Sequence, residues 1–179
     1  MKKIIMRDAT LREGLDVAGV FFSLSQRLHI ASHLSALGIT EMEVVAPGKV
    51  MDDLLFARRL KSDLCGPSLS GLIYVMSPTF VDELQAASDC LDRIDLLISP
   101  SLQRKPLSVE KKWQSLAMAL EKLVSCALSG KGVGFPNAFQ CDFPLLEDLA
   151  MRAIAHGADR ITLYDTNVCW FSENRTNRI

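Results

Sequence analysis

Short apolar runs alternate along this chain with longer stretches that repeat at helical spacing. The apolar runs are residues 2–6, 39–46, 69–76, 93–98, 133–135 and 160–164. The helical stretches between them begin near residues 23, 51, 79, 108 and 142. Strands that alternate with helices in this way are typical of βα units, which build a parallel sheet. The chain is therefore predicted to have an α/β fold.

Capping residues predict where several of these helices begin and end. Ser23, Leu24, Ser25 and Gln26 have the spacing of a capping box, and Gly38 is expected to end the helix that follows. Thr79, Ser108 and Asp142 are the other expected caps, and Gly130 and Gly157 are the other expected stops.

Two architectures fit six strands in this order. A doubly wound sheet would be finished at six strands, whereas a (β/α)₈ barrel of roughly 250 residues would need two more units. The chain has 179 residues, which suggests one domain with a proper core. No G-x-G-x-x-G motif follows the first apolar run, which argues against dinucleotide binding.

Composition narrows the possible partners. The 20 basic residues balance 21 acidic ones, so the charge favours neither nucleic acid nor an anionic membrane as a partner. No apolar run is long enough to cross a bilayer, and the apolar stretch within residues 1–7 is too short for a signal peptide. Five scattered cysteines without a C-x-x-C pair fit reduced thiols, so a cytoplasmic location is expected.

Arg12, Glu13 and Gly14 follow the first apolar run and carry the strongest chemical signal. A carboxylate is an oxygen ligand for Mg²⁺ or Mn²⁺, and Zn²⁺ also accepts it. An adjacent guanidinium keeps that carboxylate ionised and can grip a substrate oxygen. The alternative is an ordinary salt bridge at the end of a strand.

The wider segment Asp8–Gly14 reads D-A-T-L-R-E-G. It resembles the D-x-T-L-R-[DE]-G motif of the DRE-TIM metallolyases, which include 2-isopropylmalate, homocitrate and citramalate synthases and hydroxymethylglutaryl-CoA lyase. Leu37–Val44 and Gly157–Thr166 resemble two further segments of that family. The resemblance implies an incomplete TIM (β/α)₈-type barrel of about six βα units. Residues 1–166 would be a partial catalytic domain, and residues 167–179 a tail that does not match.

The resemblance also implies roles for individual residues. Arg12 would be the catalytic residue that holds and polarises a keto-acid carbonyl, and Glu13 would ligate the divalent metal (Mg, Mn or Zn). Asp16 stands where the family often has Gln and would contact substrate. Thr166 would contact the substrate carboxylate or a metal-bound oxygen. The implied substrates are acetyl-CoA and a 2-oxo acid, and a homo-oligomer is expected.

The histidines limit what this chain is expected to do. The family completes its metal site with an H-x-H pair on the seventh strand, and none of His29, His33 and His156 is in such a pair. Metal binding is therefore expected to be weak or absent, and activity impaired. His29 and His33 lie four apart, a spacing that can bind zinc, but Ile30 replaces the Glu of a metalloprotease helix. A solvated helix flank or satisfied packing is the alternative for this pair.

Three functions remain open. The first is condensation of acetyl-CoA with a 2-oxo acid, favoured by the segment Asp8–Leu11, which the lyase branch tends to lack. The second is a retro-aldol cleavage like that of hydroxymethylglutaryl-CoA lyase. The third is a truncated product without catalysis. Gln103, Arg104 and Lys105, in the loop after the fourth apolar run, are possible contacts for the phosphates of coenzyme A.

Overall fold

The computed structural model describes residues 4–46, 50–64, 66–100 and 109–166. Its strands are β1 (Arg7–Asp8), β2 (Glu41–Val45), β3 (Ser68–Tyr74), β4 (Arg93–Leu97), β5 (Gly130–Pro136) and β6 (Arg160–Tyr164). Its α-helices are α1 (Leu24–Ala36), α2 (Val50–Asp63), α3 (Phe80–Ser88), α4 (Val109–Ser125) and α5 (Phe143–Ala155). Two 3₁₀ helices, η1 (Glu13–Asp16) and η2 (Ala138–Gln140), complete the described elements.

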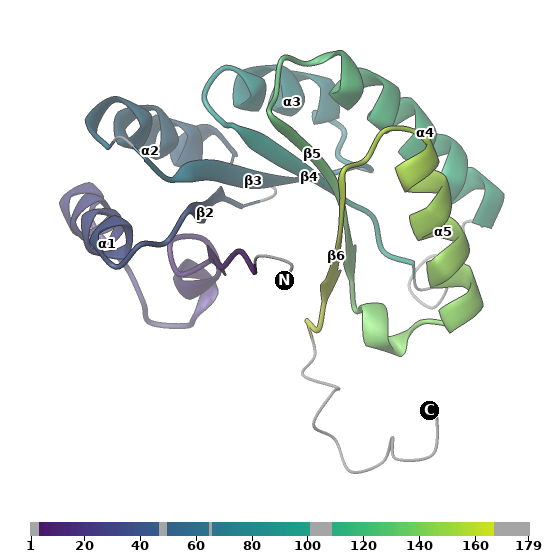
Figure 1. Cartoon of the computed structure of the whole chain (residues 1–179), viewed down its shortest axis with the longest axis horizontal. Helices are drawn as coiled ribbons and strands as arrows, with labels where there is room; N and C mark the ends of the chain where they lie inside the picture. The colour runs from purple at the N-terminus through teal and green to yellow at the C-terminus, as the bar shows by residue number, and fades with distance from the viewer. Residues whose placement is uncertain (1–3, 47–49, 65, 101–108, 167–179) are drawn as a thin grey trace, which may run out of the picture. The chain divides into compact units, whose positions relative to one another are not determined.

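The strands follow one another in the sheet in the order of the sequence, from β1 to β6 (Figure 1). The registers of β1 with β2, β2 with β3 and β5 with β6 are all parallel. A helix lies between consecutive strands along the chain, as a parallel sheet requires. The predicted fold class is confirmed: the chain has an α/β fold, an incomplete TIM-type barrel with six parallel strands.

The fold divides into two compact units. The N-terminal unit comprises Met1–Ile94 and Ala127–Gly130, and the C-terminal unit comprises Asp95–Cys126 and Lys131–Ile179. In the N-terminal unit, β2 is buried along its whole length, and α2 and α3 pack on β2 and β3. In the C-terminal unit, α4 packs on α5, and both helices turn buried leucines inward.

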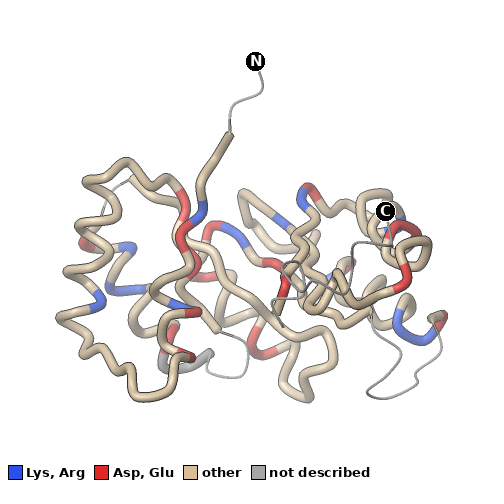
Figure 2. Tube along the Cα trace, turned by 90° about the horizontal axis from the view of Figure 1, so that it is seen from below, with Lys and Arg blue, Asp and Glu red and all other residues tan. Residues whose placement is uncertain are grey.

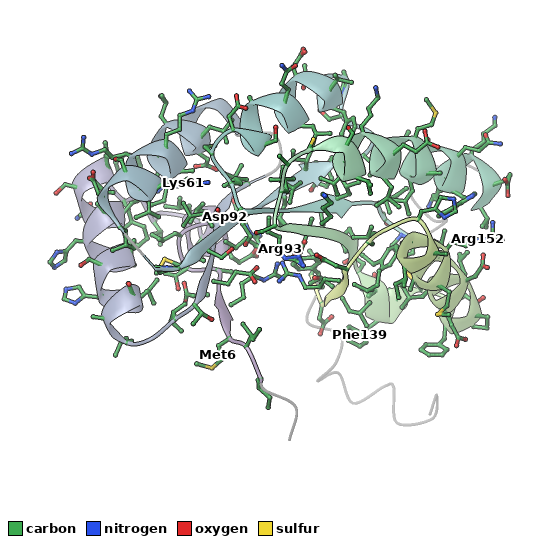
Figure 3. The ribbon with its side chains drawn as sticks, turned by 45° about the horizontal axis from the view of Figure 1, so that its top comes forward. Met6, Lys61, Asp92, Arg93, Phe139 and Arg152 are labelled. Atoms are coloured by element: carbon green, nitrogen blue, oxygen red, sulfur yellow. The ribbon has the colours of Figure 1, made fainter. Side chains whose placement is uncertain are left out.

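Charged side chains also join strands within the N-terminal unit. Lys61 Nζ donates to Asp92 Oδ1 at 3.1 Å, and Asp92 Oδ2 accepts from the Leu69 backbone N–H at 2.9 Å. Figure 3 labels Lys61, Asp92 and Arg93, the last at the start of β4. Asp92 therefore connects α2, β3 and the start of β4.

The capping signals of α1 are confirmed. Ser23 Oγ accepts from the Gln26 N–H at 3.3 Å, and Gln26 Oε1 accepts from the Ser23 N–H at 2.9 Å. The helix ends before Gly38, whose φ of 85° lies in the left-handed region that favours glycine. Gly157, with φ 98°, ends α5 in the same way.

The first strand was wrongly predicted. Strand pairing begins at Arg7, which lies opposite Glu41, and Ile4, Ile5 and Met6 are exposed rather than buried. An apolar run becomes a buried strand only where another layer covers it, and no other described residues cover this one. The charged side chain of Arg7, by contrast, lies against carboxylates of β2.

Three helix-end predictions also need correction. Helix α4 ends at Ser125, and Gly130 is the first residue of β5 rather than a helix stop. Thr79 and Asp142 stand at the N-caps of α3 and α5, but neither side chain makes a capping hydrogen bond. The Thr79 hydroxyl donates to Glu83 instead, at 2.6 Å. The expected cap Ser108 lies outside the described residues.

No helix in the described part of the chain has both the length and the apolar character that crossing a bilayer requires.

Candidate functional site

The turn after β1 is built by short-range hydrogen bonds. Asp8 Oδ1 accepts from the Thr10 N–H at 2.9 Å, and the Arg12 N–H donates to the Ala9 carbonyl at 3.0 Å. An Asp side chain that bonds two residues ahead is a common device for closing a turn. Leu11 is fully buried and anchors the turn, and η1 starts at Glu13. The turn therefore holds Arg12 and Glu13 at the carboxyl end of β1.

Arg12 lies between two carboxylates. Its Nε donates to Glu43 Oε1 at 2.6 Å, its Nη2 pairs with the same oxygen, and its Nη1 pairs with Glu13 Oε2. The side chain of Arg12 is 10% exposed, whereas that of Glu13 is 64% exposed. Two carboxylates on different edges of one guanidinium restrict its orientation. The arginine is thus fixed, and the glutamate beside it stays accessible.

Glu43, from the middle of β2, connects two arginines. Its side chain is 1% exposed, and Arg7 Nη1 lies 3.1 Å from its Oε2, on the other side from Arg12. Arg7 Nη1 also lies 3.9 Å from Glu41 Oε1. Figure 2 shows basic and acidic residues following one another along the trace soon after its N-terminal end. We call Arg7, Arg12, Glu13, Glu41 and Glu43 the N-terminal charge cluster.

The sequence interpretation did not assign a role to Glu43. A signal was present, because Glu43 interrupts an apolar run that is long enough for a buried strand. Acidic side chains are almost never fully buried unless they are paired. The pattern therefore called for a cationic partner, but it did not identify Arg7 and Arg12, which come from an earlier part of the chain.

A second ion pair, between α1 and α2, also contacts the turn. Arg27 Nη2 lies 3.1 Å from Asp53 Oδ1 and 3.5 Å from the Leu11 carbonyl oxygen. Asp53 Oδ2 accepts from the Ala46 N–H at 3.0 Å. The guanidinium of Arg27 stacks over the Phe56 ring, 3.9 Å from its centroid. These contacts connect the turn to α1, α2 and the end of β2.

The two predicted substrate contacts lie in different units. Asp16 is the exposed last residue of η1, in the same 3₁₀ helix as Glu13. Thr166 follows β6 in the C-terminal unit, where its Oγ1 accepts from the Asn137 N–H at 3.3 Å. The structure brings Arg12 and Glu13 together, and the substrate roles of Asp16 and Thr166 stay predictions. Gln103, Arg104 and Lys105 lie outside the described residues.

The donors for a divalent ion are incomplete in the described part of the chain. No group of three or more His, Cys, Asp and Glu side chains there is arranged to hold a metal. Glu13 supplies one accessible carboxylate, and Arg12 already shares it. Structural and catalytic sites use three or four protein groups or retained waters. Glu13 fits as one ligand of an ion but does not make a site by itself.

The C-terminal unit has a polar cluster of its own. Asp95 of β4 is fully buried, and Arg160 Nη2 donates to its Oδ2 at 3.0 Å and to its Oδ1 at 3.3 Å. Thr162 Oγ1 donates to Oδ2 at 3.3 Å. Gly132 leaves room for this carboxylate, because a Cβ atom there would overlap it. We call Asp95, Arg160 and Thr162 the C-terminal charge cluster.

A buried lysine lies in the same unit. Lys112, in the first turn of α4, is 6% exposed, and its Nζ donates to the Ser99 carbonyl at 2.9 Å. Burial lowers the pKa of Lys112, and the nearby Cys141 thiol opposes that shift to a smaller extent.

Comparison with known proteins decides the family. The family described as HMGL-like matches residues 3–178, which is nearly the whole chain. The chain belongs to the HMGL-like family. This membership and the relatives below confirm the DRE-TIM superfamily predicted from the Asp8–Gly14 motif.

Several synthases are similar to this HMGL-like chain. Homocitrate synthase 1 of Nostoc sp. is 26% identical over 173 residues, which cover 93% of this chain and 44% of that protein. The 2-isopropylmalate synthase of Halalkalibacterium halodurans is 29% identical over 178 residues, with coverages of 93% and 33%. The chain therefore spans less than half the length of these relatives.

A solved structure supports the fold. A truncated form of 3-deoxy-D-arabino-heptulosonate 7-phosphate synthase from Thermotoga maritima aligns with a TM-score of 0.55 and 16% identity. The alignment covers 89% of this chain and 50% of that one. At this identity the likeness concerns the fold alone.

Proposed function

We propose that this chain carries the keto-acid-binding part of an active site for condensing acetyl-CoA with a 2-oxo acid. The observation that carries the proposal is the fixed Arg12 beside the accessible Glu13, at the carboxyl end of β1. Catalytic groups of TIM-type barrels lie at the carboxyl ends of the strands. Relatives named homocitrate synthase and 2-isopropylmalate synthase favour this reaction class.

Arg12 would act on the oxygen of the keto group. In the condensation, a base takes a proton from the methyl carbon of acetyl-CoA, and the resulting enolate forms a C–C bond to the keto carbon while the π bond of the keto group opens onto its oxygen. The keto oxygen then becomes an oxyanion, and water later cleaves the thioester and releases the thiol of coenzyme A. A guanidinium that is already oriented by Glu43 and Glu13 stabilises the developing charge without having to reorganise.

Glu13 is the proposed metal ligand of this chain. A divalent ion such as Mg²⁺, Mn²⁺ or Zn²⁺ held there would polarise the same keto oxygen as a Lewis acid. Only one protein ligand is identified, so we expect weak binding.

Asp16 and Thr166 are proposed substrate contacts, Thr166 for the carboxylate of the 2-oxo acid. The division into residues 1–166 and a tail, and a homo-oligomeric state, are likewise proposals.

Binding of a 2-oxo acid tests the proposal even if turnover is impaired. Binding of 2-oxoglutarate and 2-oxoisovalerate, measured by calorimetry with the whole chain, should be lost or strongly weakened in Arg12→Lys. Lysine keeps the charge but lacks the planar fork. Arg59→Lys is the matched control, because Arg59 is an exposed residue of α2 that pairs with Asp63. Equal binding by wild type and Arg12→Lys would refute the role of Arg12.

Turnover assays then separate the functions. Thiol release from acetyl-CoA that requires a 2-oxo acid supports the condensation. Loss of one oxyanion-stabilising donor costs about 10² to 10³ in rate, so Arg12→Lys should reduce thiol release to that extent. Acetoacetate formation from hydroxymethylglutaryl-CoA would instead indicate the lyase reaction. Binding without either product would indicate a chain that does not catalyse.

A further inference from the structure

We propose that His29 and His33 on α1 form a chelating site for a divalent transition-metal ion, separate from the site of Arg12 and Glu13. Both imidazoles are exposed, and their Nε2 atoms lie 2.9 Å apart. The ring centroids are 4.4 Å apart, and the ring planes meet at 89°. Residues four apart on a helix lie on the same face, so one ion can reach both side chains. The two ligands are already gathered at one point on the surface.

The affinity of imidazole nitrogens for divalent ions indicates the type of metal. The 2.9 Å between the two Nε2 atoms is the length of their hydrogen bond, and rotation of the exposed side chains can direct both nitrogens to one ion. Affinity for such ligands rises along the first-row metals to Ni²⁺ and Cu²⁺ and falls again at Zn²⁺. We therefore expect Ni²⁺ or Cu²⁺ to bind more tightly than Zn²⁺.

Ligation requires a lone pair on both Nε2 atoms, so the hydrogen bond between the two rings is given up and the tautomer of one ring changes. Without a metal, one ring donates its Nε2–H to the Nε2 lone pair of the other. When both Nε2 atoms bind the ion, the donor ring carries its proton on Nδ1 instead. Each ring then offers its Nε2 lone pair to the ion, as metal binding requires. Water would fill the remaining coordination positions.

The rest of α1 allows a cation to approach. Arg27 is the only Asp, Glu, Lys or Arg residue of the helix, and it pairs with Asp53 and stacks on Phe56. The capping box fixes the first turn, and Ala31 between the two histidines is fully buried. Because the helix is already fixed, little conformational entropy is lost when both imidazoles bind one ion, which favours binding.

Calorimetric titration of the whole chain with Ni²⁺, and separately with Zn²⁺, tests the site. His29→Gln and His33→Gln each remove one ligand, and His156→Gln is the matched control. His156 stands at the end of α5, where its Nδ1 lies 3.0 Å from the Arg152 carbonyl oxygen. We expect one Ni²⁺ per chain and weaker Zn²⁺ binding. Each of the first two variants should weaken Ni²⁺ binding about a hundredfold, because two-point attachment is lost.

Thermal melts without metal show whether the variants stay folded. Both side chains are exposed, so His29→Gln and His33→Gln should melt as wild type does. Ni²⁺ binding that is unchanged in these two variants, or lost equally in His156→Gln, would overturn the proposal. Tighter binding of Zn²⁺ than of Ni²⁺ would overturn the inferred choice of metal. None of these results depends on Arg12 or Glu13, so this test is distinct from that of the proposed function.

Discussion

The two charge clusters contain the same chemistry but differ in what they leave accessible. In the N-terminal charge cluster, the buried Glu43 is shared by Arg7 and Arg12, and Arg12 leads outward to the exposed Glu13. In the C-terminal charge cluster, the buried Asp95 receives donors from Arg160 and Thr162 of a single strand. One network ends at a carboxylate that a ligand can reach, and the other does not.

The position along the strands differs as well. Arg12 and Glu13 lie just beyond the carboxyl end of β1, whereas Arg160 is the first residue of β6, and Asp95 and Thr162 lie in the middle of their strands, short of the carboxyl ends. In TIM-type barrels, polar groups at carboxyl ends serve chemistry, and those at amino ends serve stability. We therefore expect the N-terminal charge cluster to matter for ligands and the C-terminal charge cluster to matter for folding alone.

Glu43→Ala should give the largest loss of stability, because it leaves two guanidiniums without their shared carboxylate. Removing one partner of a buried pair costs about 3 to 5 kcal/mol, and we expect about 4 kcal/mol in the free energy of unfolding here. Urea denaturation measures this value. Glu43→Gln keeps the shape of the side chain and should cost less. A loss below that of Asp95→Ala would contradict the idea that Glu43 supports two arginines.

Asp95→Ala is expected to cost about 3 kcal/mol in the free energy of unfolding, since Arg160 loses its carboxylate but is partly exposed. Urea denaturation again provides the measurement, with Asp95→Asn as the variant that keeps the shape. Binding of a 2-oxo acid to the folded variant should stay at the wild-type level. Weakened binding would mean that the C-terminal charge cluster also serves the ligand.

The difference between the clusters also shows what a sequence can predict here. The capping box of α1, its stop at Gly38 and the bounds of β6 were predictable, because neighbouring residues determine them. The pairing of Asp95 with Arg160 was not predicted, since 65 positions separate the two residues along the chain. Apolar pattern alone misplaced β1, because it takes no account of whether other elements cover a run.

In the candidate site, too, the local features were predictable from the sequence and the long-range contacts were not. Arg12 and Glu13 were identified from a contiguous motif, and their contact is local. Glu43, which orients Arg12, was missed because its role depends on the pairing of β1 with β2. The sequence pattern shows which residue types are present, but it does not show which distant strands pair or in what register.

Arg7→Met tests whether Arg7 and Arg12 share Glu43, with a smaller expected loss of stability than Glu43→Ala. Arg12 still neutralises Glu43 in this variant, so we expect a loss of about 1.5 kcal/mol, typical of a hydrogen bond to a charged group. Denaturation in urea measures the loss, and Arg59→Met, at an exposed ion pair on α2, should cost less than about 1 kcal/mol. Equal losses in the two variants would show that Arg7 is only a surface charge.

The smallest expected effect is a pH dependence that belongs to the C-terminal unit. Burial lowers the pKa of Lys112 in the folded state, so the unfolded chain binds more protons between that pKa and the ordinary pKa of lysine. The free energy of unfolding should therefore rise with pH through this alkaline window. Lys112→Met should remove the rise, and Lys111→Met, at the exposed neighbouring position, should retain it.

In the N-terminal unit, Cys90 should make stability change with pH in the opposite direction, so the experiment must separate its contribution from that of Lys112. Burial raises the pKa of the Cys90 thiol, so there the folded state keeps its proton longer, and stability falls as pH rises above the ordinary thiol pKa. Urea denaturation across the alkaline range in a Cys90→Ala background removes this fall and leaves the Lys112 contribution. If Lys112→Met in that background leaves the slope unchanged, the buried amine is not what the pH dependence reports. An unchanged slope would also mean that the folded and unfolded chains hold the Lys112 proton equally well.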